Sequence, residues 1–299
     1  MTFRSATHAD AEAIADLIRA YDRAHGGETG TDAEEVRDDW TWQGFELERD
    51  TLAVEDYGRV AAYAQAVRRP PEGEVQIDAW VHPGSEDRAH GDELYRRMEE
   101  RALELGGDRL VTGVFGNDLW SAQLLAARGW AYARSLFRLA IDLEAPPPRP
   151  AWPEGVDVRP FRPGDEAAFH TVAVEAFADD PTYEAGPLER WSGDRLDRSA
   201  FDPAFWTLAL ASGRPVGVAV GYAAGPGGYV ELLGVVPAWR RRGLGRAFLL
   251  QSFAAFQGEG RTHVSLHVDA DNTTGARRLY HDAGMRETNR IDRWEKPAG

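Results

Sequence analysis

Apolar and polar residues follow one another along this chain in an order that predicts strands and amphipathic helices, and the order occurs twice. Each half begins with a short strand and an alanine-rich helix. An acidic segment and a second helix, ending near Trp40 or Trp191, then lead to a two-stranded hairpin. The predicted first helices are Asp10–His25 and Asp165–Phe177, and the hairpin strands are Leu52–Glu55 with Val60–Val67 and Leu208–Ala211 with Val216–Ala223.

Short sequence matches between the halves indicate an internal duplication. Thr51-Leu-Ala-Val matches Thr207-Leu-Ala-Leu at an offset of 156 residues, and Gly58-Arg59 matches Gly213-Arg214 at an offset of 155. Between the halves, residues 144–153 are rich in proline, which can continue neither a helix nor a central strand. We therefore predict an α/β protein of two similar domains, residues 1–145 and 154–299, joined by a linker over residues 146–153.

The strongest functional pattern lies in the second half. A predicted strand from Val230 runs through a proline turn into a basic, glycine-containing loop and then into a helix over Leu244–Gln257. The first turn of a helix presents unpaired backbone N–H groups and the positive end of the helix dipole. Gly243 and Gly245 leave this backbone accessible because they lack a Cβ atom. The loop predicts a site for a nucleotide or coenzyme diphosphate, although a polar turn with two incidental glycines has the same pattern.

Composition and charge narrow the class of protein. The 299 residues carry a formal net charge of −15, which argues against nucleic acid as a partner. Residues 1–145 contribute −13 and residues 146–299 contribute −2, so the second half suits an anionic coenzyme better. The chain has no cysteine, which excludes disulfides and thiolate chemistry. It also has no signal-peptide pattern and no apolar run of membrane-spanning length, so we expect a cytoplasmic protein that contacts no membrane.

A second pattern follows about 30 residues downstream of the loop. His263–Val268 reads as another strand, and it is followed by Asn272 and a short helix that carries Tyr280 one turn before Gly284. Together with the loop, this order of strand, loop, helix, strand, Asn and Tyr resembles the GNAT superfamily of N-acetyltransferases. The resemblance implies two tandem GNAT domains, each a mixed, mostly antiparallel twisted sheet flanked by helices. It also implies acetyl-CoA as the acyl donor and no metal.

The chemistry of acetyl transfer to an amine assigns roles to two side chains. An alkylamine is mostly protonated at neutral pH, so one group must take its proton and another must protonate the leaving thiolate. The resemblance implies Tyr280 as the acid and Glu231 as the base, acting directly or through water. A packing role for Tyr280 and an arginine-paired or solvent-facing Glu231 remain open. The coenzyme-binding residues implied by the resemblance are Leu233, Gly234, Val235, Arg240, Arg241, Arg242, Gly243, Leu244, Gly245, Arg246 and Asn272.

The loop of the first half departs from this pattern. Aligning Gly91 with Gly243 places Glu93 at the position of Gly245. A carboxylate there opposes a phosphate group through like-charge repulsion. The same segment carries three further acids, Glu86, Asp87 and Asp92.

The first half also lacks the tyrosine. Asn117–Gly129 has the same length as Asn272–Gly284, and this register places Leu125 where the second half has Tyr280. We therefore predict that acetyl-CoA binds in the second half. The first half is predicted to be a degenerate copy that is structural or forms a wall of the substrate site.

The acceptor is predicted from charge. An acidic segment between the first two helices of the second half predicts a small, cationic primary amine, bound with the help of Asp179, Asp180 and Tyr229. A solvated acidic loop is the alternative. The acids of this segment are Asp179, Asp180, Glu184 and Glu189. We expect a monomer or homodimer.

Two other functions remain open. The tandem layout resembles the mycothiol synthase family, which acetylates the cysteinyl amine of a pseudodisaccharide. However, residues 180–184 replace that family's His-Pro-Glu-Gln-Gly run, and its acid would fall at Tyr229 rather than Glu231. A non-catalytic acyl-CoA-binding module would keep the loop without needing Tyr280. His263 and His267 lie on one face of a strand without converging, so they do not predict a metal site.

Overall fold

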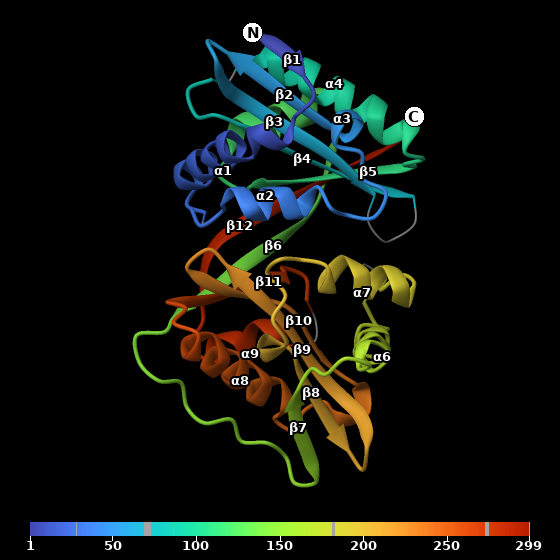
Figure 1. The fold of residues 1–299 in the computed structure, drawn as a ribbon, viewed down its shortest axis with the longest axis vertical. Helices are drawn as coiled ribbons and strands as arrows, with labels where there is room; N and C mark the ends of the chain where they lie inside the picture. Colours follow the sequence, from blue (N-terminus) through green and yellow to red (C-terminus); the bar gives the residue numbers. More distant parts are fainter. Residues whose placement is uncertain (28, 69–72, 86, 181–182, 273–274, 299) are drawn as a thin grey trace. The chain divides into compact units, whose positions relative to one another are not determined.

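The structure is a computed structural model that describes residues 1–27, 29–68, 73–85, 87–180, 183–272 and 275–298. It confirms an α/β protein in which a mixed sheet with flanking helices occurs twice (Figure 1). Unit 1 consists of Met1–Phe137, Asp269–Asp271 and Thr288–Gly299, and unit 2 consists of Arg138–Val268 and Asn272–Glu287. Within the described residues, we find no helix with the length and apolar composition needed to cross a bilayer.

Unit 1 has the strand order β1-β2-β3-β4-β5-β12-β6. Strands β4 and β5 are parallel, and the pairs β1–β2, β2–β3, β3–β4 and β5–β12 are antiparallel. The strands are β1 (Thr2–Arg4), β2 (Thr51–Asp56), β3 (Arg59–Arg68), β4 (Glu74–Val81), β5 (Arg109–Phe115), part of β6 (Ala131–Asp142) and most of β12 (Arg286–Pro297). The helices are η1 (His8–Asp10), α1 (Ala11–His25), α2 (Ala33–Asp39), α3 (Leu47–Asp50), α4 (Arg88–Glu104) and α5 (Leu119–Ala127).

Unit 2 repeats this arrangement with the strand order β6-β11-β10-β9-β8-β7. Its one parallel pair among the registered strands is β10–β11. The strands are β7 (Val156–Pro160), β8 (Thr207–Ala211), β9 (Arg214–Ala224), β10 (Gly227–Val235) and β11 (His263–Asp269). The helices are α6 (Glu166–Ala176), α7 (Leu188–Leu196), η2 (Pro203–Phe205), η3 (Pro237–Trp239), α8 (Leu244–Gly258) and α9 (Ala276–Asp282).

Helices cover both faces of the sheet in unit 2. Figure 1 shows α8 and α9 on one face and α6 and α7 on the other. On the α8 face, glycines make room for phenylalanine rings: a Cβ atom on Gly228 would lie 2.4 Å from the ring of Phe256. On the opposite face, a Cβ atom on Gly234 would lie 3.1 Å from the Cβ of Ala176 in α6. Because Gly228 and Gly234 have no side chain, the helices can pack closely against the strands at these two positions.

The duplication is visible in a repeated ion pair. In unit 1, Arg4 donates two hydrogen bonds to Asp10, of 2.7 and 2.8 Å. In unit 2, Arg159 donates two to Asp165, of 2.5 and 2.7 Å. The two pairs are 155 residues apart, which equals one of the offsets between the sequence matches.

Most predicted elements are confirmed, with ends that differ by a few residues. The first helices and both hairpins lie where the pattern places them. The second helix of the second half, α7, runs five residues past Trp191 instead of ending near it. The described linker, residues 146–153, contains no helix or strand.

The last strand differs from the sequence interpretation. The predicted second domain, residues 154–299, includes the C-terminal strand, but Thr288–Gly299 belongs to unit 1. There β12 pairs with β5 in antiparallel register, from Ile291 opposite Phe115 to Pro297 opposite Arg109. In return, Arg138 and the residues after it in β6 belong to unit 2. The compact units therefore do not coincide with residues 1–145 and 154–299. The boundaries predicted from the sequence describe the two copies of the repeat, and they stay a prediction.

Candidate active site

Strands β10 and β11 separate part of the way along their length. Their backbone pairing is limited to Gly228 opposite Val264 and Tyr229 opposite Ser265, although both strands are described to their ends. Beyond these pairs, the edge of β10 that faces β11 has no paired strand residue in the described part of the chain. Such an edge can hydrogen-bond an extended ligand that contains amide groups. The predicted coenzyme residues Leu233, Gly234 and Val235 lie on this separated stretch.

A β-bulge places Glu231 beside the separation. Val230 pairs with Gly221 and Leu232 pairs with Val220, so Glu231 is an extra residue in β10. In unit 1, β4 pairs with β3 without such an interruption. A bulge inserts one residue and redirects the side chains that follow it. Glu231 therefore has no structural counterpart in unit 1.

The basic loop ends at the first turn of α8. Gly243 is the N-cap residue and has a φ of +89°, a conformation that favours glycine. The first hydrogen bond of the helix runs from the Ala247 N–H to the Gly243 carbonyl, 3.0 Å. The N–H groups of the preceding turn have no partner within the helix. These groups suit an anion such as a diphosphate.

Three arginines add positive charge at this turn. Arg241, Arg242 and Arg246 are exposed, and none forms an ion pair with a carboxylate in the part of the chain that the structure describes. Arg242 lies over the ring of Trp239, 4.6 Å from its centroid. The residues present therefore fit the diphosphate of a coenzyme A molecule, through backbone N–H groups and three available guanidinium groups.

Gly245 connects this turn to the helix that carries Tyr280. A Cβ atom on Gly245 would lie 3.0 Å from Cδ2 of Leu279 in α9. The glycine thus allows α8 and α9 to pack closely. Tyr280, the next residue, is buried, and burial raises its pKa to about 12. Its hydroxyl group is therefore protonated throughout the neutral pH range.

Arg240 has different contacts from the other loop arginines. It forms an ion pair of 2.9 Å with Asp179 and donates a hydrogen bond of 2.9 Å to the Ala176 carbonyl. Asp179 thus contacts the basic loop. Asp180 lies in the turn after α6, where its N–H donates to the Phe177 carbonyl, 2.9 Å.

Asn272 lies four residues before Ala276, the first residue of α9. Its side-chain oxygen accepts a hydrogen bond of 3.4 Å from the Ala276 N–H. The structure therefore gives Asn272 a capping contact at the helix that carries Tyr280.

Glu231 is paired with an arginine, which was one of the open alternatives. Its carboxylate accepts a hydrogen bond of 2.6 Å from Arg195 of α7. The Arg195 guanidinium lies 4.5 Å from the ring centroid of Trp191 and also donates to the Trp191 carbonyl, 3.0 Å. These contacts hold the carboxylate on the α7 face of the sheet.

A tyrosine and a histidine meet on the same region of β10 and β11. The Tyr229 hydroxyl lies 2.9 Å from Nδ1 of His267. Burial, together with the positive charge of Arg138, lowers the pKa of His267 to about 4, so its ring is neutral at pH 7. Burial also raises the pKa of Tyr229 well above its usual range. Within the described residues there is no group of three or more side chains that could hold a metal ion, so neither His263 nor His267 belongs to such a group.

The contact of His267 with Tyr229 was not predicted from the sequence, where His267 was considered only as a metal ligand. Strand register is the feature that brings these two side chains together. His267 lies two residues after Ser265, the partner of Tyr229 in the parallel register, and residues two apart on a strand share a face. The register itself comes from the structure.

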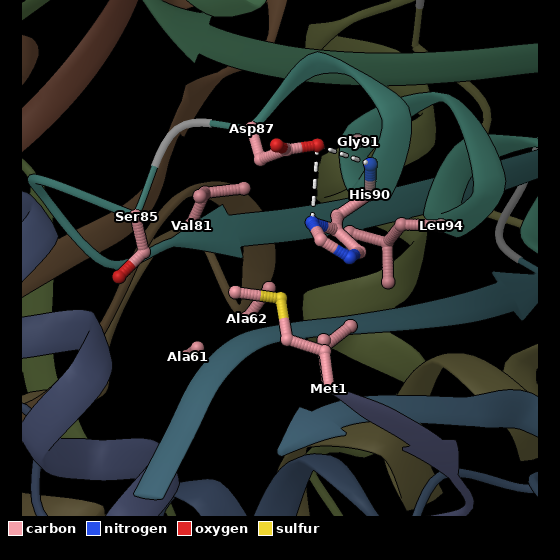
Figure 2. A pocket seen from close by; sticks show the side chains of 10 residues that line it. Met1, Ala61, Ala62, Val81, Ser85, Asp87, His90, Gly91 and Leu94 are labelled. Atoms are coloured by element: carbon pink, nitrogen blue, oxygen red, sulfur yellow. Dashed lines mark hydrogen bonds and ion pairs between the residues drawn. The ribbon is translucent and has the colours of Figure 1, made fainter. Parts of the chain in front are cut away.

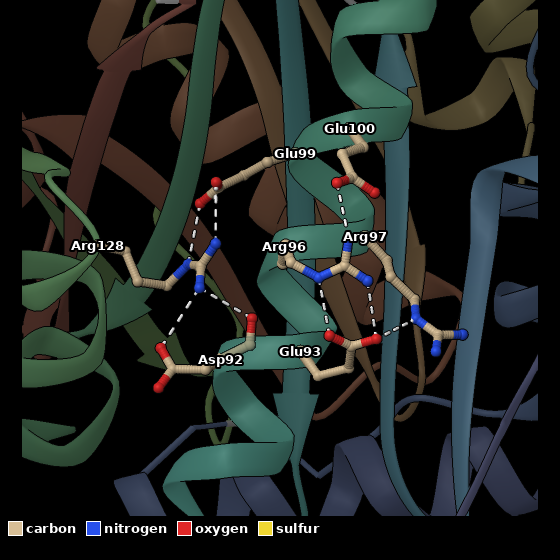
Figure 3. Close-up of polar contacts among 7 residues, drawn as sticks. All are labelled: Asp92, Glu93, Arg96, Arg97, Glu99, Glu100 and Arg128. Atoms are coloured by element: carbon tan, nitrogen blue, oxygen red, sulfur yellow. Dashed lines mark hydrogen bonds and ion pairs between the residues drawn. The ribbon is translucent and has the colours of Figure 1, made fainter.

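The structure corrects the alignment of the two basic loops. A Cβ atom on Gly91 would lie 2.7 Å from Cδ2 of Leu124 in α5, as one on Gly245 would lie 3.0 Å from Leu279 in α9. Gly91 therefore corresponds to Gly245 and not to Gly243, and the placement of Glu93 opposite Gly245 was wrong. Glu93 instead forms ion pairs with Arg96 and Arg97 on its own helix (Figure 3).

An acid occupies the helix start in unit 1 nevertheless. Asp87 is the N-cap residue of α4, and its carboxylate accepts a hydrogen bond of 3.1 Å from the His90 N–H. The same carboxylate lies 3.0 Å from the His90 ring, and Figure 2 shows both contacts above a small pocket. The N–H groups that would receive a phosphate thus face a carboxylate. Glu86, one of the acids that the sequence places in this segment, lies outside the described residues.

Two further side chains fill unit 1 where unit 2 has its site. Trp80 occupies the strand position of Gly234 and stacks on Tyr63, with ring centroids 5.9 Å apart. Leu125, at the position of Tyr280, is fully buried in the core of unit 1. Unit 1 therefore has neither the small residue nor the hydroxyl group that unit 2 offers.

Comparison with known proteins agrees with this geometry. The model of the Acetyltransferase (GNAT) family matches residues 13–130 and 167–285. The mycothiol acetyltransferase of Thermobispora bispora is 38% identical over 72% of this chain and 72% of that protein. The mycothiol acetyltransferase of Kineococcus radiotolerans is also 38% identical, over 78% of this chain and 77% of that protein.

Two solved structures share the fold. A GCN5-related N-acetyltransferase from Sphaerobacter thermophilus is 33% identical, with a TM-score of 0.83 over 99% of this chain and 95% of that chain. A tandem GNAT protein from the clavulanic acid biosynthesis pathway is 18% identical. Its TM-score is 0.77 over 100% of this chain and 98% of that chain. The chain therefore belongs to the GNAT family, with two GNAT domains in tandem, and is an acyltransferase.

Proposed function

We propose that unit 2 transfers the acetyl group of acetyl-CoA to the primary amine of a small molecule. The observation that carries the proposal is the contact between Gly245 and Leu279, because it brings the anion-binding turn of α8 to the helix that carries Tyr280. A coenzyme diphosphate at this turn would direct the rest of the coenzyme toward the separated strands. The thioester would then lie near Tyr280.

Residues of this chain provide each part of the coenzyme site. The backbone of Leu233–Val235 would hydrogen-bond the amide-containing arm. The first-turn N–H groups of α8, with Arg241, Arg242 and Arg246, would hold the diphosphate. Tyr280 would protonate the leaving thiolate, because a buried phenol keeps its proton at neutral pH. Glu231 is the proposed proton acceptor from the sequence, acting directly or through water.

The acceptor has two candidates. A cationic amine was inferred from the acids after α6, but Asp179 contacts Arg240, and Glu231 contacts Arg195. These ion pairs reduce the negative potential available to a cation. The second candidate function is acetylation of the cysteinyl amine of a pseudodisaccharide. It is supported by identities of 33–38% to proteins named mycothiol acetyltransferase.

Thiol release from acetyl-CoA tests both versions. We would assay spermidine, glucosamine and a cysteinylated pseudodisaccharide as acceptors, at low and high salt. A cationic acceptor requires turnover with spermidine and a steep fall of kcat/KM as salt rises, since screening weakens charge attraction. Turnover with the pseudodisaccharide, insensitive to salt, supports the second candidate. Tight acetyl-CoA binding without thiol release for any amine would instead indicate a binding module.

A further inference from the structure

We infer that His267 accepts the proton of the acceptor amine in unit 2, in place of Glu231. The inference deepens the proposed function and depends on it. His267 lies on β11, beyond the last residue that pairs with β10, so its ring is beside the separated stretch of the two strands. This stretch is where the thioester would be held.

The contacts of His267 leave one ring nitrogen available. Nδ1 is 2.9 Å from the Tyr229 hydroxyl, while Nε2 is shielded from solvent and has no hydrogen-bond partner among the described residues. A buried polar atom without a partner is costly unless a ligand or water completes it. Nε2 is therefore suited to contact a polar group of the substrate.

The charged groups around the ring keep it neutral. Arg138 of β6 donates a hydrogen bond of 2.7 Å to Ser265, two residues before His267 on the same strand. Burial of the ring and the positive charge of Arg138 both favour the neutral imidazole, which is the form whose Nε2 lone pair can accept a proton. On the other side, the ring of Tyr229 lies against that of Tyr222 of β9, with centroids 5.2 Å apart, and burial raises the pKa of Tyr229 well above its usual range.

Glu231 is less available for the same task. It holds a formal negative charge that Arg195 already contacts at 2.6 Å, and removal of that contact would leave Arg195 unpaired beside Trp191. Glu231 thus positions Arg195 and α7 over the acceptor face. The neutral imidazole of His267 can accept a proton without breaking an ion pair.

The proton transfer balances as follows. The lone pair on Nε2 takes one proton from the substrate ammonium group, with the Nδ1–H donating to the Tyr229 oxygen. The neutral amine then forms the C–N bond, and the C–S bond breaks as Tyr280 protonates the thiolate. One of the two protons left on the nitrogen restores Tyr280 and the other stays on the product amide, while the imidazolium releases its proton to solvent.

The test compares three variants on glucosamine and the cysteinylated pseudodisaccharide. His267→Asn keeps a group at the position of Nδ1 but removes Nε2, and we expect kcat/KM to fall about 10²-fold at pH 7. The loss should shrink as pH rises toward the pKa of the amine, because the substrate then loses its proton unaided. His263→Asn, on the same strand, is the matched control and should match the parent protein.

Two results would overturn the inference. One is a loss in His267→Asn that stays constant with pH, which indicates a structural role. The other is pH-dependent recovery in Glu231→Gln instead. A separate arm needs no turnover: nitrogen-15 NMR of the imidazoles with coenzyme A bound should show the Nδ1–H tautomer for His267. An Nε2–H tautomer contradicts the inference, whereas failure of every amine in the parent protein contradicts the proposed function.

Discussion

Asp179 and Arg240 form an ion pair of 2.9 Å that joins the segment after α6 to the basic loop before α8. Asp179, for which an acceptor-binding role is predicted from its charge, thus contacts an arginine of the predicted coenzyme loop. The side chain of Asp179 is 70% exposed and that of Arg240 31%, so the pair contributes little to stability by itself. Its effect should appear in binding of the anionic coenzyme.

Asp179→Asn should strengthen acetyl-CoA binding. The substitution removes a carboxylate that competes with phosphate for Arg240, so we expect Kd to fall by about two- to fivefold at low salt, with a smaller change at high salt. The KM of the acceptor should not change. Calorimetry and initial-rate kinetics measure the two quantities, and a raised acceptor KM with unchanged Kd would restore the sequence-based role of Asp179.

Tyr280→Phe should lower kcat about 10²-fold with little change in acetyl-CoA affinity, because a proton donor acts as the thiolate leaves. Burial raises the pKa of Tyr280 to about 12, so the donor form persists up to strongly alkaline pH. No alkaline loss of kcat should therefore arise from Tyr280 below about pH 11. An unchanged kcat in the variant would leave Tyr280 with a packing role.

We expect one acetyl-CoA site per chain, and Gly243→Asp should abolish acetyl-CoA binding at this site. The carboxylate would face the bound diphosphate, and the φ of +89° adds strain for any residue with a Cβ atom. Gly84→Asp in unit 1 is a matched control, since Gly84 has a φ of +86° and also has open space around its Cβ position. Titration calorimetry should show one site in the parent and control proteins. Two equally tight sites would mean that unit 1 still binds the coenzyme.

Asp10→Asn should destabilise the protein in a pH-dependent way. The Arg4 guanidinium holds the pKa of the Asp10 carboxyl at about 2, below the value in an unfolded chain. A lowered pKa contributes stability above about pH 4, and this contribution is lost as pH falls toward 2. We expect a cost of about 1–2 kcal/mol at pH 7 that disappears near pH 2. Urea unfolding at several pH values measures it, and a cost independent of pH would exclude the ion pair as its cause.

The sequence alone determined most of the elements and the position of the basic loop before α8. Apolar periodicity is a local property, so it located the helices and hairpins of both halves to within a few residues. The loop before α8 was also predictable, because a helix start with Gly243 and several arginines has the same chemistry in any fold. Tyr280 was found through the order of neighbouring motifs rather than through its own contacts.

Only the tertiary structure decided which side chains meet. The pairs Glu231–Arg195 and Tyr229–His267 join residues 36 and 38 positions apart, and their contacts depend on the bulge in β10 and on the register of β10 with β11. A one-residue change in register turns a side chain to the opposite face, and no local pattern specifies it. The match of Gly91 to Gly245 and the place of β12 in unit 1 likewise depend on packing between distant segments. Which distant residues come into contact depends on how their side chains fit together in three dimensions, and the order of residues along the chain does not show this.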